Sequence, residues 1–237
     1  MTHTVARNLL ALSLWLRFDQ AGSGGDRQSG WCGQSGRDVR GALSKVTIPA
    51  FDGRGFLPPF LGADETTHAR SPYDATMSEL VAALGTTPVR QNILFGLLKY
   101  RALLGSFGYV SGVQFIDGSF VENVETREAR DPGDIDVFSF LMQPAQYVGN
   151  VALWRSTGFR QWQAEVVNQN LNKLRYQSDT YGVVVDQGGP LQMMDATIYW
   201  YSLFSHKKIS HDWKGFVRVP LNPADDQIAL ASIVSGP

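Results

Sequence analysis

Residues 115–137 read FIDGSFVENVETREARDPGDIDV, and they hold the most informative pattern in the chain. The stretch opens with an apolar run, breaks at Gly118-Ser119 and closes on Asp134 and Asp136, which one isoleucine separates. Successive side chains of a strand point to opposite faces, so the two aspartates share a face. Their Cα atoms then lie about 6–7 Å apart. Each carboxylate disfavours ionisation of the other unless a cation lies between them.

The residues around this acidic pair favour chemistry on phosphate. Mg²⁺ prefers oxygen ligands, and two carboxylates on one strand face can bridge the ions of a two-metal site. Upstream, Gly118 and Ser119 follow a predicted strand over residues 110–116. A small residue there lets backbone N–H groups approach a phosphate, and a serine hydroxyl adds a hydrogen bond. We therefore expect phosphoryl or nucleotidyl transfer with two Mg²⁺ ions, or Mn²⁺ in their place.

At these residues the chain resembles the DNA polymerase β-like nucleotidyltransferase superfamily. The signature is an apolar residue, Gly-Ser, a spacer and then Asp-apolar-Asp-apolar, which residues 116–119 and 134–137 carry here. Fourteen residues separate Ser119 from Asp134, more than is usual in the superfamily, so the spacer must carry an extra loop. The spacer's charged residues suit a solvent-exposed loop: Glu122, Glu125, Arg127, Glu128, Arg130 and Asp131.

A closer resemblance is to an uncharacterised bacterial family of nucleotidyltransferase-like proteins. It rests on the segments IPAFDGRGFLPP, DGSFVEN…DPGDIDV, SDTYGVVV and YWYSLFSHKK…WKGFVRVPL, and it covers residues 46–221. The resemblance implies an α/β (α+β) fold, with a small mixed sheet flanked by helices. It also implies a catalytic apparatus, but it specifies no substrate.

Composition limits the partners of this chain. Its 237 residues are 43% apolar, which suffices for a substantial core. The net charge of −1, from 21 basic and 22 acidic side chains, gives no overall attraction to nucleic acid or anionic membranes. A single cysteine, Cys32, excludes an internal disulfide and fits the cytoplasm. No apolar run approaches the ~20 residues of a membrane span, so no membrane contact is expected.

The chain divides into three parts. Residues 1–45 are rich in Gly, Ser and Gln, and we expect them to be disordered or to be an extension from an upstream start codon. Residues 46–221 form the nucleotidyltransferase-like domain, and residues 222–237 follow as a C-terminal tail.

Within the domain, helix and strand patterns alternate. Residues 48–60 are apolar and proline-punctuated, which predicts an extended strap, and residues 62–76 are polar and turn-like. Helices are expected over residues 77–84, 87–104, 157–176 and 191–204. Strands are expected over residues 110–116, 134–140, 179–186 and 215–221.

A third carboxylate near the acceptor is common in two-metal transferases. Asp179 begins the predicted strand after the long helix, where the superfamily carries its third acid, and Asp186 stands at the other end. The two lie about 23 Å apart at strand rise and cannot both reach one metal pair. The resemblance favours Asp179, and Asp186 stays open as a turn residue or as the alternative.

One dense cationic cluster follows the last predicted helix: His206, Lys207, Lys208, His211, Lys214 and Arg218. The functional interpretation is a clamp on the triphosphate, to which Lys207, Lys208 and Lys214 would contribute. The alternative is a solvated loop between a helix and a strand.

Aromatic residues could stack a nucleobase. Trp154, Trp162, Trp200 and Trp213 are candidates, but helical spacing favours a core position for Trp162 and Trp200. Tyr181, two residues after Asp179, is the better stacking candidate.

These patterns lead to one functional expectation and two alternatives. The expected enzyme moves a nucleoside monophosphate from an NTP, ATP first among them, to the hydroxyl of an unidentified protein, RNA or small molecule. Asp134, Asp136 and Asp179 would be catalytic and bind the metal, and Gly118 and Ser119 would hold the phosphates. One alternative is a degenerate fold that binds a partner protein, as in a toxin–antitoxin pair. The other is a glycosyltransferase, which would not require the Gly-Ser turn.

Overall fold

The centre of the fold is a five-stranded mixed sheet with strand order β1-β5-β2-β3-β4. The structure is a computed structural model and describes residues 47–235. β3 is antiparallel to β2 and parallel to β4, and β5 is antiparallel to β2 and parallel to β1. The strands are β1 (Tyr73–Asp74), β2 (Gly112–Asp117), β3 (Ile135–Leu141), β4 (Ser178–Val184) and β5 (Val217–Pro220). The expected character of residues 1–45 lies outside the described residues.

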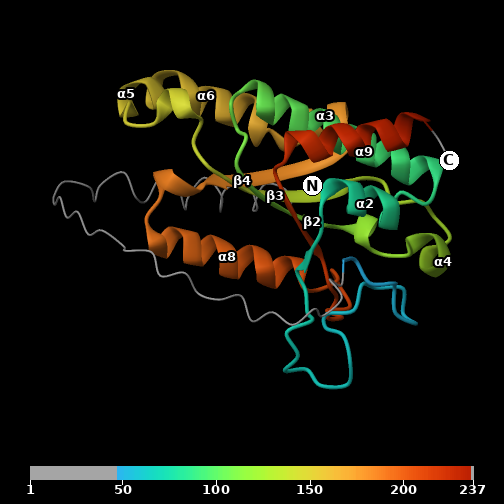
Figure 1. Cartoon of the computed structure of the whole chain (residues 1–237). Coiled ribbons are helices and arrows are strands. Elements are labelled where there is room, and N and C mark those ends of the chain that lie inside the picture. Colours follow the sequence, from blue (N-terminus) through green and yellow to red (C-terminus); the bar gives the residue numbers. More distant parts are fainter. Residues whose placement is uncertain (1–46, 236–237) are drawn as a thin grey trace, which may run out of the picture. The chain divides into compact units, whose positions relative to one another are not determined.

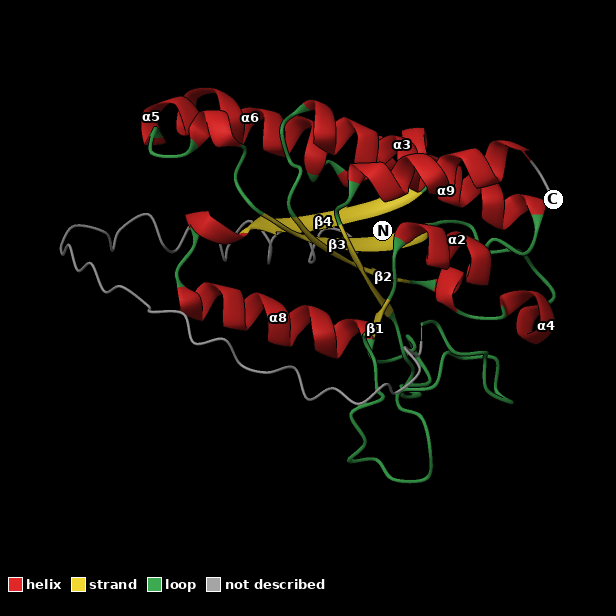
Figure 2. Cartoon of the chain, in the orientation of Figure 1, coloured by secondary structure: helices red, strands yellow, loops and turns green. Residues whose placement is uncertain are grey.

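Helices cover both faces of this sheet, with α3 and α9 on one side and α8 on the other (Figures 1 and 2). The expected fold class, a small mixed sheet flanked by helices, is confirmed. The α-helices are α2 (Met77–Leu84), α3 (Pro88–Ser106), α4 (Val124–Glu128), α5 (Val151–Leu153), α6 (Phe159–Gln161), α7 (Gln169–Tyr176), α8 (Pro190–Phe204) and α9 (Pro223–Ser235).

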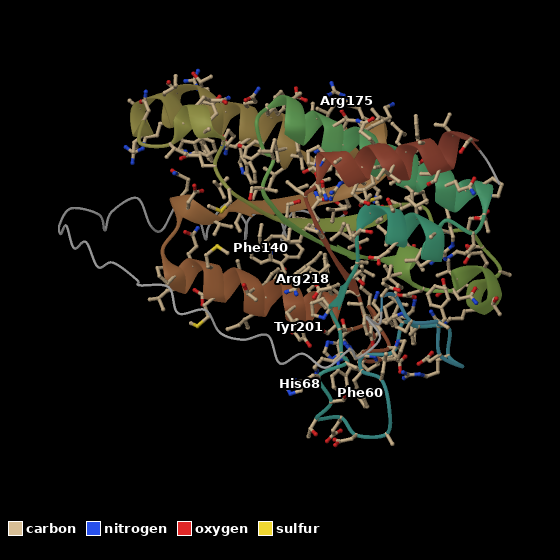
Figure 3. The ribbon with its side chains drawn as sticks, in the orientation of Figure 1. Phe60, His68, Phe140, Arg175, Tyr201 and Arg218 are labelled. Carbon is tan, nitrogen blue, oxygen red and sulfur yellow. The ribbon has the colours of Figure 1, made fainter. Side chains whose placement is uncertain are left out.

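Strand alternation divides the apolar side chains between two cores. Ile116 and Val137 face the larger core, which also contains Trp162. The α8 side holds a second cluster, in which Phe138 stacks on Trp200 with ring centroids 4.4 Å apart. Figure 3 shows Phe140 of this cluster between the sheet and α8. The core interpretation of Trp162 and Trp200 is confirmed, since each is 6% exposed.

The helices predicted over residues 77–84 and 87–104 begin where expected. Thr76 caps α2 in a capping box with Glu79, in which each side chain accepts from the other residue's backbone N–H. Thr87 caps α3, whose first residue is Pro88, by accepting the Arg90 N–H. Both caps need contacts within only a few residues, so the start of a helix can be predicted from the local sequence, as it was at Thr87.

The single long helix predicted over residues 157–176 is wrong. Two π-helical turns interrupt this region, at Trp154–Gly158 and Trp162–Val166. The helix then ends, and Asn168 starts α7 as an N-cap whose side chain accepts the Leu171 N–H. A residue that caps a helix leaves helical backbone geometry, and the apolar spacing did not reveal this break.

The spacer between Ser119 and Asp134 is only partly the exposed loop that its charges suggested. Residues 120–122 at its start are buried. There the buried Arg90 side chain donates to the carbonyl oxygens of Phe120 and Glu122. Glu122 itself is 3% exposed, so its predicted exposure is wrong. The later residues around α4 reach the surface, and Arg130 and Asp131 are exposed.

The segment interpreted as a C-terminal tail contains α9. Ala229 of this helix is fully buried, and Asp226 accepts hydrogen bonds from Arg101 of α3. Asp225 accepts the backbone N–H groups at the start of α2. The helix therefore packs on α2 and α3. Among the helices of residues 47–235, none has the length and apolar character that a bilayer span requires.

Candidate active site

Three aspartates stand side by side at one end of the neighbouring strands β2, β3 and β4. In the strand register, Asp117 of β2 lies opposite Asp136 of β3, and Asp136 lies opposite Asp179 of β4. Directly opposed residues on neighbouring strands point to the same face, with Cβ atoms about 5 Å apart. We call these three residues the acidic row. It lies on the α8 side of the sheet, because Phe138 and Tyr181, two residues further along β3 and β4, belong to the α8 cluster.

Asp134 extends this arrangement along β3. It precedes the first residue of the strand and lies two positions from Asp136, so it takes the same side by alternation. The four carboxylates act on one another: burial first, and then the charges of Asp117, Asp179 and Asp134, raise the pKa of Asp136 to about 7. A group of acids with this mutual repulsion favours a bound cation.

Gly118 touches the acidic row directly. It has a φ of 85°, and a Cβ placed there would lie 2.9 Å from Asp136 Oδ2. Only glycine readily combines this backbone conformation with so close an approach. The expected proximity of the Gly-Ser turn and the acidic pair on adjacent strands is therefore present. Ser119 follows as the first residue of a 3₁₀ turn, Ser119–Val121.

On the β2 side of the acidic row, Lys214 is buried. Its Nζ lies 2.7 Å from Asp117 Oδ1, 3.0 Å from Glu122 Oε1 and 3.3 Å from the Gly118 carbonyl oxygen. Burial alone would lower the pKa of Lys214, but the carboxylates of Asp117 and Glu122 raise it above its ordinary value. The ammonium group is therefore charged and fixed.

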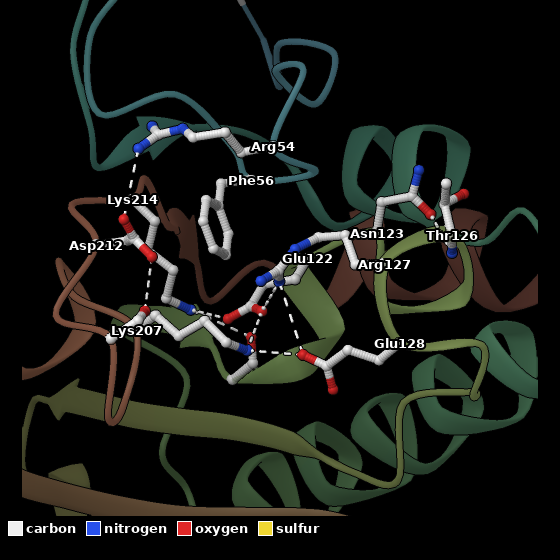
Figure 4. Close-up of polar contacts among 12 residues, drawn as sticks. Arg54, Phe56, Glu122, Asn123, Thr126, Arg127, Glu128, Lys207, Asp212 and Lys214 are labelled. Atoms are coloured by element: carbon white, nitrogen blue, oxygen red, sulfur yellow. Dashed lines mark hydrogen bonds and ion pairs between the residues drawn. The ribbon is translucent and has the colours of Figure 1, made fainter.

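Glu122 connects Lys214 to further cations (Figure 4). Its Oε2 accepts from Lys207 at 2.9 Å and from Arg127 at 2.8 Å, and Lys207 also donates to Glu128. Burial opposes ionisation of Glu122, but Lys214 and Lys207 hold its pKa below the ordinary value. Lys207 and Lys214 thus neutralise carboxylates of the protein itself.

On the β4 side, a lysine of α7 contacts the site. Lys173 Nζ forms an ion pair with Asp134 Oδ2, and the lysine side chain is 56% exposed. The hydrogen bond to Asp134 is the main cause that raises the pKa of Lys173. Sequence patterns gave no reason to place Lys173 here, because the contact depends on how α7 packs against β4.

The remaining predicted phosphate ligands differ in their surroundings. Lys208 is exposed, and its charge acts against the raised pKa of Asp136, so it lies within electrostatic reach of the acidic row. Arg218 instead pairs with Asp74 on the neighbouring strand. His206 and His211 are exposed on the loop before Lys214.

The two candidates for a third carboxylate lie at opposite ends of β4. Asp179 stands in the acidic row, beside Asp136. Asp186 follows the far end of the strand, where its Oδ1 accepts the Gln143 N–H at 2.8 Å. Geometry therefore associates Asp179, and not Asp186, with Asp134 and Asp136.

Base stacking has fewer candidates than the sequence offered. Tyr181 is 3% exposed and packs against Trp200, so its ring face is covered, and Trp154 is 2% exposed. Trp213 is 38% exposed and contacts Phe60 at 5.6 Å between ring centroids.

Asp117 is the site residue that the sequence interpretation missed. It completes the alternation of Val113 and Phe115 along β2, a signal that was present in the sequence but was assigned to the turn. Its partner Lys214 is 97 residues away in the chain, and no local pattern joins them.

The donor set of the site suits a hard divalent cation. Carboxylate oxygens are the ligands that Mg²⁺ prefers, and the raised pKa of Asp136 reports charge that a cation would relieve. Within residues 47–235, no group of three or more His, Cys, Asp or Glu side chains is arranged as a ready-made metal site. Asp117 and Asp134 bind lysines here, so the carboxylates would have to reorient around an ion.

Comparison with known proteins places the chain in a family. A family of unknown function (DUF6932) matches residues 49–220. The chain belongs to this family. The DUF6932 match begins before the Gly-Ser turn and ends in β5, so it includes the whole acidic row and both flanking lysines. No match was found among curated proteins or solved structures.

Proposed function

We propose that this DUF6932 protein is a Mg²⁺-dependent nucleotidyltransferase that moves a nucleoside monophosphate from an NTP to an acceptor hydroxyl. One observation supports this most strongly. The acidic row and Asp134 converge on one sheet face, with Gly118 in contact with Asp136. That combination joins carboxylates for a metal to a small-residue turn for phosphate, as in the resembling nucleotidyltransferase superfamily.

The residues divide between metal and phosphate binding. Asp134, Asp136 and Asp179 would hold the Mg²⁺, as two ions in the superfamily pattern. The turn at Gly118 and Ser119 would receive the β- and γ-phosphates. Bound Mg²⁺ supplies neutralisation of the charge that develops on the phosphoryl oxygens.

The ion pairs within the cationic cluster change which lysine we assign to the triphosphate. Lys207 and Lys214 are engaged by Glu122, Glu128 and Asp117. Lys208 is exposed and acts electrostatically on Asp136. We therefore assign the triphosphate contact to Lys208, and an internal structural role to the other two.

Transfer itself requires an acceptor oxygen in line with the leaving pyrophosphate. The acceptor hydroxyl oxygen forms a bond to the α-phosphorus as the bond to the bridging oxygen breaks. Asp179 lies beside Asp136 and would accept the hydroxyl proton. Pyrophosphate carries away the electron pair of the broken bond.

A transfer assay tests this proposal. Purified protein is incubated with Mg²⁺, each of the four α-labelled NTPs and a cell lysate, and label on protein, RNA and small molecules is scored. Asp136→Asn and Asp179→Asn should abolish labelling. Asp186→Asn is the matched control, because it removes a carboxylate at the far end of β4 and should keep labelling. Equal labelling by the wild-type protein and Asp136→Asn would refute the assignment.

A second candidate is a partner-binding protein on the same fold. The ion pair of Lys173 with Asp134 is compatible with it, since this carboxylate already has a cationic partner without a metal. Calorimetry with MgATP separates the two functions. A nucleotidyltransferase binds MgATP and loses this binding in Asp136→Asn, whereas the partner-binding protein shows no dependence on Asp136.

A further inference from the structure

Lys214 is the most enclosed charged group beside the acidic row. Its side chain is 2% exposed, and those of its partners Asp117 and Glu122 are 7% and 4% exposed. A charge at such depth is stable only when several acceptors surround it. Lys214 has three: the two carboxylates and the Gly118 carbonyl oxygen.

The backbone around Lys214 is fixed as firmly as its side chain. The Lys214 N–H donates to the Ser205 carbonyl oxygen at 2.8 Å, and the Gly215 N–H donates to the Leu57 carbonyl oxygen at 2.7 Å. A Cβ at Gly215 would lie 2.5 Å from the Pro58 carbonyl oxygen, so the backbone that follows Lys214 packs directly against the backbone at Leu57 and Pro58. The ammonium group is therefore held in place before any ligand arrives.

The exposed lysine on the other side of the row provides a contrast. Lys173 contacts Asp134 from a side chain that is 56% exposed, and water can replace this ion pair at little cost. Displacement of Lys214 from Asp117 would instead leave a buried ammonium group with only one of its two carboxylates. A metal ion would therefore displace Lys173 from Asp134 at a much lower cost than Lys214 from Asp117.

We propose that Lys214 is a positioning residue that withholds Asp117 from the metal and fixes the Gly118 turn against Asp136. This inference rests on the proposed metal site. The ligand carboxylates are then Asp134, Asp136 and Asp179, although Asp117 stands in the same row. The ammonium group of Lys214 permanently neutralises Asp117, so no additional metal ion is needed beside that carboxylate.

Binding of Mn²⁺ to the full-length protein tests the assignment, with free Mn²⁺ measured by electron paramagnetic resonance. The variant is Glu122→Gln with Lys214→Met, which removes the ammonium group and one buried carboxylate together and so limits the damage to folding. It should gain one Mn²⁺ equivalent or bind Mn²⁺ at least tenfold more tightly than the wild-type protein. Adding Asp117→Asn should cancel the gain. Unchanged binding in the folded double variant would overturn the proposal.

Arg127→Met is the matched control, because Arg127 also donates to Glu122 but is not bonded to Asp117. It should keep the Mn²⁺ binding of the wild-type protein. A gain equal to that of the double variant would show that loss of any nearby cation suffices, and would overturn the proposal.

A single substitution tests the same point if the double variant does not fold. Asp117→Asn should change Mn²⁺ affinity by less than about fivefold, whereas Asp136→Asn should lower it at least a hundredfold. Equal losses would make Asp117 a metal ligand and refute the inference. If the wild-type protein binds no Mn²⁺, the proposed metal site fails. The double variant still decides the role of Lys214, since a gained Mn²⁺ site supports it and no gain refutes it.

Discussion

The two sides of the acidic row each carry a lysine, and the two lysines differ in burial and in number of partners. On the β2 side, Lys214 is 2% exposed and contacts Asp117, Glu122 and the Gly118 carbonyl oxygen. On the β4 side, Lys173 is 56% exposed and pairs with Asp134. The same ion-pair chemistry therefore gives a permanent element of the fold in one place and an exchangeable contact in the other.

This difference shows how a row of acids can be divided between structure and chemistry. A buried ion pair is costly to break, because the partner left behind stays desolvated. An exposed pair contributes little, because water and salt compete with it. Of the two lysine–carboxylate pairs, the one between Lys173 and Asp134 is therefore the easier one for a ligand to replace.

The largest expected effect is on stability. Lys214→Met should lower the free energy of unfolding by about 3–5 kcal/mol, because it leaves a buried charge uncompensated. Lys173→Met, the matched substitution on the other side, should cost less than about 1 kcal/mol. Urea denaturation followed by circular dichroism measures both. Similar losses for the two variants would remove the distinction between the two sides.

The next effect is on catalysis. Asp136→Asn should reduce label transfer at least about 100-fold, because the metal contributes several kcal/mol of charge stabilisation in the transition state. Transfer rates at saturating Mg²⁺ and NTP give the comparison, with Asp186→Asn as the control. Residual activity above a tenth of the wild-type rate would mean that Asp136 is not a metal ligand.

The same substitution should stabilise the protein when no metal is present. Burial and the neighbouring carboxylates raise the folded-state pKa of Asp136 to about 7, while its unfolded value is 3.8. Between these pH values the unfolded chain has lost a proton that the folded protein keeps. Wild-type stability therefore falls as pH rises through this window and is level above it.

Asp136→Asn removes this fall. In EDTA at pH 8 it should add about 1–3 kcal/mol of stability, a value reduced from the full shift because Asp136 is only partly buried. At pH 3 it should add nothing. Thermal melts across this range measure the difference, and saturating Mg²⁺ should reverse it at pH 8. A variant that is less stable at pH 8 would contradict the repulsion within the acidic row.

The smallest expected effect concerns Lys208, an exposed lysine of the cationic cluster. Lys208→Ala should weaken NTP binding about 3–10-fold, the amount that a single exposed charge contributes, without a change in stability. Calorimetry with MgATP measures the affinity. Lys99→Ala is the control, because Lys99 is exposed on α3 and contacts Phe95 there. Equal affinities for the Lys208 and Lys99 variants would exclude Lys208 from the triphosphate contact.

Local rules determined much of this protein. The cap at Thr87 and the proline after it located the start of α3, and strand alternation placed Asp134 and Asp136 on one face. The same rules missed the break before α7, where the side chain of Asn168 caps the start of a new helix. Apolar spacing alone could not distinguish one helix from a series of short ones.

Only the tertiary structure decided what surrounds these carboxylates. The register of β2, β3 and β4 added Asp117 and Asp179 to Asp136, and a loop 97 residues further along the chain brought Lys214 to Asp117. Glu122, which was expected at the surface, is buried and forms an ion pair with that lysine. The physical reason is that caps and alternation depend on neighbours within a few residues. Pairing and desolvation depend on distant segments that meet only when the sheet and its helices have assembled.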